Sequence, residues 1–252
     1  MHIHIPDGVL PIWLWLTGFL VTSILLVIVL PKLKKEIKKI PMVGMMTAVA
    51  LLVMSIPLGL PVHLNLMVLI GLIVGVRWSL VVALTVNFIL ASFGHGGLTI
   101  VGLNTLLLWL QATAGIFLFR FFIKFFKNYF ASASIVTFIS LFLSFLLLVG
   151  IVAVSQVDPR NFLSHKHEHQ AVETAYHENH ESEVNTEKIK KETEHAREEE
   201  TLAHTKISLI TFTILSLPIF LLGAVVESLV TGFVVQFVRR VKPELIIKSL
   251  KH

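Results

Sequence analysis

Long apolar runs separated by short polar connections are the main pattern along this chain. A helix that crosses the hydrocarbon core of a bilayer needs about 20 apolar residues. Six runs are candidates for such helices: residues 10–30, 41–60, 79–93, 98–123, 131–155 and 207–238. The pattern therefore predicts an all-α membrane protein.

A seventh apolar run, residues 64–76, is too short to cross a membrane alone. As a helix its 13 residues reach roughly 20 Å, against a hydrocarbon thickness of roughly 30 Å. Non-helical backbone at membrane depth is tolerated where protein surrounds it. We therefore expect a seven-helix transmembrane bundle in which this short helix is flanked by re-entrant backbone.

Composition agrees with a membrane location and excludes several kinds of site. The 252 residues are 55% apolar and 15% charged, and the chain contains no cysteine. Disulfides and thiolate metal sites are therefore excluded. No basic region precedes the first apolar run, so the N-terminus does not resemble a cleavable signal. The excess of positive charge is segregated along the chain, which does not indicate a nucleic-acid partner.

One long segment, residues 156–206, interrupts the apolar pattern. It contains 12 acidic residues, 7 basic residues and 7 histidines, and it has too few apolar residues to form a core. The chain is therefore predicted to have three regions: a membrane bundle at 1–155, a His-rich, acidic and disordered loop at 156–206, and a last span with a basic tail at 207–252. The loop histidines could concentrate metal at the outer surface, or the loop could be a solvated spacer.

The distribution of lysine and arginine predicts the orientation of the bundle. Basic residues in short connections mark the cytoplasmic side of a membrane protein. They gather here at alternate ends of the spans, at 32–39, Arg77, 120–127 and 239–251. We therefore expect the N-terminus and the 156–206 loop outside and the C-terminus in the cytoplasm.

Histidines gather on the predicted outer side. His2 and His4 follow the amino terminus, and His63 and His95 lie in the two outer connections. Amine, amide and imidazole nitrogens suit late first-row divalent metals. The residues alone leave open whether these histidines share a metal site or are ordinary surface side chains.

Four motifs in order resemble a known family. They are HIPDG at 4–8, PVHL at 61–64, FGHGGLTIVGLN at 93–104 and GAVVESLVTGFVVQFVRRVKPEL at 223–245. Together they look like the substrate-binding membrane subunit, CbiM/NikM type, of energy-coupling-factor transporters for cobalt and nickel. The resemblance covers about residues 1–125 and 207–247.

The resemblance implies capture of Co²⁺ or Ni²⁺ from outside as the transported substrate. In the family the ion is held by the N-terminal amine, by the amide and imidazole of the next histidine, and by the histidine of the VHL motif. Those roles fall on Met1, His2 and His63. An amide nitrogen binds metal only after losing its proton, so binding should release protons. The residues do not distinguish cobalt from nickel.

The N-terminus departs from the family pattern by two added residues. Counted from Pro6-Asp7-Gly8, the family histidine falls on His4, but counted from the amine it falls on His2. We favour Met1 and His2 as ligands, with His4 as a further ligand or neighbour. Asp7 either lies beside the ligands or caps the first helix. His95 is expected to support the site from beside the ligands rather than to bind the ion.

Energy for uptake must come from other subunits, because the chain has no GxxxxGK[ST] motif and should bind no ATP. By the resemblance these partners are a membrane coupling subunit, paired ATP-binding-cassette ATPases and often a small accessory membrane subunit. A membrane metal receptor without transport is the alternative function. No paired acid and base indicates an enzyme, and the expected location is the plasma membrane.

One carboxylate, Glu227, falls inside the last predicted span. Burying a charge in a membrane is expensive, so we expect Glu227 to face the bundle and to have a polar partner. Asn87, Asn104 and Gln111 are the candidate partners within other spans. Helix packing and coupling to a partner subunit both remain open as its role.

Overall fold

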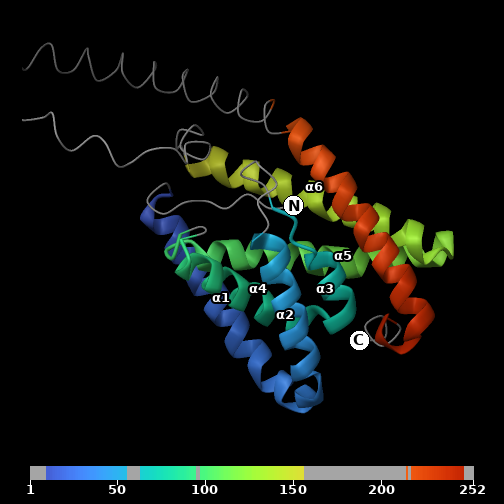
Figure 1. The fold of residues 1–252 in the computed structure, drawn as a ribbon. Coiled ribbons are helices and arrows are strands. Elements are labelled where there is room, and N and C mark those ends of the chain that lie inside the picture. Colours follow the sequence, from blue (N-terminus) through green and yellow to red (C-terminus); the bar gives the residue numbers. More distant parts are fainter. Residues whose placement is uncertain (1–9, 56–62, 95–96, 156–213, 215–216, 247–252) are drawn as a thin grey trace, which may run out of the picture.

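The chain is almost entirely helical in the part that the structure, a computed structural model, describes: residues 10–55, 63–94, 97–155, 214 and 217–246. The helices are α1 (Ile12–Leu33), the 3-10 helix η1 (Lys34–Lys39), α2 (Ile40–Ser55), α3 (Met67–Val74), α4 (Val76–Ser92), α5 (Val101–Phe126), α6 (Tyr129–Ser155) and a last long helix, Leu217–Val241 (Figure 1). The prediction of an all-α membrane protein is confirmed. The 156–206 loop lies outside the described residues.

Within the described residues, four helical stretches are long and apolar enough to cross a membrane. They are Ile12–Ser55, Val101–Phe126, Tyr129–Ser155 and Leu217–Val241, with Val76–Ser92 as a shorter apolar helix. The first stretch comprises α1 and α2, which fold back on each other at η1, where Glu36 has non-helical backbone angles (Figure 1). Lysines surround this turn, so α1 and α2 are two helices rather than one continuous helix.

The ends of the helices differ by a few residues from the predicted spans. Pro11 precedes α1 with extended backbone, and no side chain caps the helix there. The fourth span begins at Val76 rather than Ser79, because glycine at position 75 ends α3 and α4 follows at once. Lys127 in the left-handed conformation ends α5.

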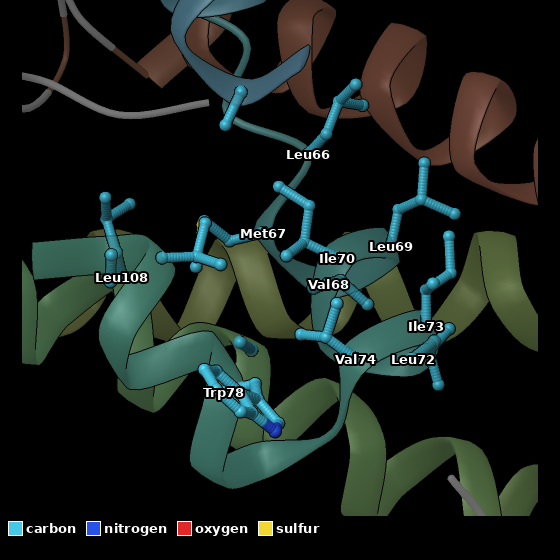
Figure 2. Close-up of a cluster of buried hydrophobic side chains, with 14 of the residues drawn as sticks. Leu66, Met67, Val68, Leu69, Ile70, Leu72, Ile73, Val74, Trp78 and Leu108 are labelled. Carbon is cyan, nitrogen blue, oxygen red and sulfur yellow. The ribbon is translucent and has the colours of Figure 1, made fainter. Parts of the chain in front are cut away.

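The short helix α3 is the centre of the bundle. It has only eight residues, about 12 Å of helix, and all eight are buried. In Figure 2 the α3 side chains point in several directions, and Leu69, like Leu66 just before the helix, is directed toward the ribbon of the last helix. A helix that is apolar all round is expected to be fully enclosed. The predicted short third helix is therefore confirmed, and the other helices surround it.

Two glycines bring α1 and α5 into backbone contact. A Cβ atom built on Gly102 would lie 2.6 Å from the backbone nitrogen of Phe19, and one built on Gly18 would lie 2.9 Å from that of Leu103. The hydroxyl of Thr22 donates a hydrogen bond of 2.9 Å to the Gly102 carbonyl at the same crossing. Small residues permit this close approach of membrane helices.

Two interactions join basic segments that the charge pattern assigns to one side of the membrane. Arg77 at the start of α4 lies 3.3 Å from Glu36, which also pairs with Lys39 at 2.8 Å. Arg239 near the end of the last helix lies 3.8 Å from the ring centre of Tyr129, at the start of α6. The first contact joins two of the predicted basic segments, and the second brings the basic tail to Tyr129, two positions after the 120–127 segment.

Candidate functional site

A non-helical segment, residues 63–66, carries the histidine of the PVHL motif into the bundle. Asn65 bonds to Gln111, which lies about 15 Å along α5 from its first residue. The backbone nitrogen of Asn65 also donates to Glu227, which lies a similar distance from the first residue of the last helix. The 63–66 segment therefore lies at mid-height between α5 and the last helix. His63 is half-buried at its start.

The side chains of Asn65 and Gln111 form a reciprocal pair. Asn65 Nδ2 donates to Gln111 Oε1 at 3.0 Å, and Gln111 Nε2 donates to Asn65 Oδ1 at 3.0 Å. Asn65 Oδ1 also accepts a hydrogen bond of 2.9 Å from the backbone nitrogen of Met67, the first residue of α3. Both side chains are buried. One asparagine therefore joins α5 to the start of α3.

Glu227 binds the same segment from the other side. Its Oε2 accepts a hydrogen bond of 3.3 Å from the backbone nitrogen of Asn65, and its Oε1 accepts one of 3.1 Å from that of Leu66. The first backbone N–H groups of a helix have no partner within the helix, and no water is available for them in a membrane interior. The Glu227 carboxylate and the Asn65 side-chain amide together accept from three consecutive backbone N–H groups, that of Asn65 and the first two of the helix, at Leu66 and Met67.

Leu66 has a left-handed backbone conformation, with φ of 51°. For a residue other than glycine this conformation costs on the order of 1–2 kcal/mol and persists only where the surroundings enforce it. The side chain of Leu66 is buried against the central cluster, and its N–H is held by Glu227. The strained residue lies three positions after His63, so the course of the 63–66 segment is closely fixed.

Of the site residues predicted from the sequence, only His63 lies in the described part of the chain. Met1, His2, His4, Asp7 and His95 lie outside it. Among residues 10–55, 63–94, 97–155 and 217–246, no group of three or more histidines, aspartates or glutamates could hold a metal ion. The described residues thus contain one predicted ligand and the framework around it.

A groove between α5 and α6 does not offer a metal site. It has a volume of about 270 Å³, and leucine and phenylalanine side chains make up most of its wall. Its polar groups are the amide of Gln111 and hydroxyls such as those of Thr113 and Ser140. These groups are poor ligands for the nitrogen-preferring divalent metals.

The sequence located Glu227 in the bundle but did not identify its partners. Two backbone amides of the 63–66 segment bind it, and Gln111 reaches that segment through Asn65. Asn87 bonds to Ala83 and Thr105 instead. One sequence signal was available: Asn65 lies two residues before α3, and asparagine is common at helix N-termini, where its side chain accepts from a backbone N–H.

Comparisons with known proteins agree with this architecture. The profile of the CbiM family, described as "Cobalt uptake substrate-specific transmembrane region", matches residues 4–245. No curated protein sequence matches the chain.

Two solved structures share the fold. One, described as a truncated transition metal transporter, has a TM-score of 0.63 and 16% identity, over 94% of this chain and 99% of its own. The other, described as a transition metal transporter, has a TM-score of 0.64 and 16% identity, over 97% of this chain and 96% of its own. The chain belongs to the CbiM family: it is a multi-pass plasma-membrane component of a metal uptake transporter.

Proposed function

We propose that this chain is the subunit that captures Co²⁺ or Ni²⁺ at the outer face of the membrane for ATP-driven uptake. The observation that carries the proposal is His63, half-buried in a non-helical segment that is held at mid-depth inside a bundle of the CbiM family. An imidazole placed there can receive an ion from outside. It is also shielded from bulk water by the surrounding helices.

The amino-terminal segment supplies the other donors in this proposal. The amine of Met1, the backbone amide and imidazole of His2, and the imidazole of His63 make four nitrogen donors. Amine, amide and imidazole of adjacent residues close neighbouring chelate rings, which favours a near-planar ligand set. His4 is the alternative chelating histidine, because the family histidine falls on it when the residues are counted from Pro6-Asp7-Gly8. His95 and Asp7 support the ligands.

Orientation and partners follow from the charge pattern and the family. The amino terminus faces outside in this proposal, and the basic ends around Glu36–Arg77 and Tyr129–Arg239 face the cytoplasm. A coupling subunit and ATP-binding-cassette ATPases supply the energy, with a small accessory membrane subunit as a further partner. Seven membrane helices then surround one site.

Metal titration of the purified full chain in detergent tests the site. We expect tight binding of Ni²⁺ or Co²⁺ by the wild type, loss of tight binding in His63→Ala, and loss when one residue is added before Met1. His252→Ala is the matched control, because it removes a histidine from the opposite end of the chain. Unchanged affinity in both site variants would refute the amine-centred site.

Transport needs a separate measurement. Cells that also produce the coupling subunit and the ATPases should accumulate radioactive nickel or cobalt in an ATP-dependent way. Loss of accumulation in His63→Ala would connect the site to uptake. Tight binding with no accumulation in any subunit combination would instead identify a metal receptor.

A further inference from the structure

We propose that Glu227 is a positioning residue for metal binding: it fixes the backbone of the 63–66 segment and thereby the imidazole of His63. The inference rests on the proposed function, because it gives Glu227 a role in the affinity of that site. It assigns no ligand role to Glu227.

The first argument is the kind of group that the carboxylate binds. Glu227 is fully buried, and its two oxygens accept hydrogen bonds from two consecutive backbone nitrogens, at 3.3 Å from Asn65 and 3.1 Å from Leu66. A buried carboxylate is expensive, so it is retained where several donors converge on it. A general packing role needs no such pair of donors at one point.

The second argument is the proximity of these donors to His63. Asn65 is two residues after His63, and consecutive Cα atoms are only about 3.8 Å apart. A displacement of the Asn65 backbone is therefore transmitted directly to the histidine. Metal sites tolerate little displacement of a ligand, so residues that orient ligands influence affinity strongly.

The third argument is that the segment is held from both sides. Glu227 on the last helix binds its backbone, and Gln111 on α5 binds the side chain of Asn65. The left-handed conformation of Leu66 shows how strongly this arrangement constrains the chain. Without Glu227, the N–H groups of residues 65 and 66 would lose their partners in the membrane interior. We expect the segment to rearrange to satisfy them.

The test compares Glu227→Gln with Thr231→Val in the purified full chain. Glutamine has nearly the same shape, but one carboxylate oxygen becomes an NH₂ group that faces a backbone N–H and cannot accept from it. Thr231 lies one turn further along the same helix and is also fully buried. Its hydroxyl makes no hydrogen bond within the described residues. Valine therefore removes a buried polar group without releasing the 63–66 segment.

Two readouts are taken on each protein: hydrogen–deuterium exchange of the peptide containing residues 63–67, and affinity for Ni²⁺ and Co²⁺ by titration. For Glu227→Gln we expect faster exchange in that peptide, unchanged exchange in α6, and affinity lower by roughly 10- to 100-fold. Thr231→Val should match the wild type in both.

Gln111→Met is a second variant for the case that Glu227→Gln does not fold. It releases the Asn65 side chain from α5 while Glu227 stays in place, and it should weaken metal binding in the same direction. Tight binding by the wild type with unchanged affinity in Glu227→Gln and in Gln111→Met overturns the positioning role. Weaker binding without faster exchange overturns it too, because Glu227 would then act by another route. Absence of metal binding by the wild type refutes the proposed function itself.

Discussion

Gly18 of α1 and Gly102 of α5 lie in backbone contact, and a Cβ atom on Gly102 would stand 2.8 Å from the carbonyl carbon of Gly18. No side chain separates the two helices at this point. The segment that precedes α1 carries the predicted metal donors, and α5 carries Gln111. The Gly18–Gly102 contact therefore sets the distance between α1, which follows the segment with the predicted donors, and α5, which anchors the 63–66 segment.

Replacing Gly102 by alanine should destabilise the bundle. The added methyl group would meet the Phe19 backbone at 2.6 Å, and backbone cannot yield as a flexible side chain does. We expect a loss of roughly 1–3 kcal/mol, as for other overpacked cores. Gly44→Ala in α2 is the control, because its Cβ would meet nothing within 4 Å. Thermal unfolding in detergent should show a lower midpoint only for Gly102→Ala. Equal midpoints for the two variants would show that α1 and α5 can move apart enough to accommodate the methyl group.

Asn65 and Gln111 should be energetically coupled. Truncating either to alanine leaves the buried amide of the other without its partner, which costs about 1–3 kcal/mol. The double variant should cost less than the sum of the two single variants, because the second truncation removes the orphaned group. A double-mutant cycle from unfolding measurements gives this difference. Strict additivity would mean that the pair is not formed.

The ion pair between Glu36 and Arg77 should make a small, pH-dependent contribution to stability. Partial burial acts to raise the pKa of Glu36, but Lys39 and Arg77 outweigh it, so the pKa lies below the ordinary glutamate value. A lowered pKa means that the ionised Glu36 stabilises the fold. This stabilisation is fully present when the pH is above the ordinary glutamate pKa, and it is lost as the pH falls through the lowered pKa of Glu36.

Glu36→Gln should therefore be less stable than the wild type at neutral pH, by at most about 1 kcal/mol because Arg77 is half-exposed. The two proteins should converge in acid and at high salt. Unfolding curves over a pH series measure the difference. If the two proteins still differed in stability at a pH below the glutamate pKa, the effect would not come from the negative charge of Glu36.

The choice between His2 and His4 can be made by single substitutions. If the amine of Met1 chelates, His2→Ala should abolish tight binding and His4→Ala should reduce it much less. The opposite ranking would place the chelating histidine at position 4 and would indicate a mature chain that begins at Ile3. Mass spectrometry of the purified protein supplies the independent check on where the chain starts.

The periodic, local part of this structure could be predicted from the sequence, and the contacts between helices could not. The run at 64–76 was recognisably too short to cross a membrane, and it forms the eight-residue α3. Burial cost alone indicated that Glu227 faces the bundle. Its partners were missed because backbone N–H groups are present at every position and carry no sequence signal. The Gly18–Gly102 crossing was missed for a related reason: glycines in membrane helices are common, and only the tertiary arrangement brings these two together.

The contact between Glu227 and the 63–66 segment also has a consequence for biosynthesis. Leu66 and Glu227 are separated by 161 positions, and the last helix is made after everything else in the bundle. While the ribosome is still producing the first six helices, the N–H groups of residues 65 and 66 lack their final acceptor. The segment around His63 can therefore reach its final conformation only when the last helix has been inserted. The nascent chain then becomes competent to hold a metal ion only after the helix that carries Glu227 has been made.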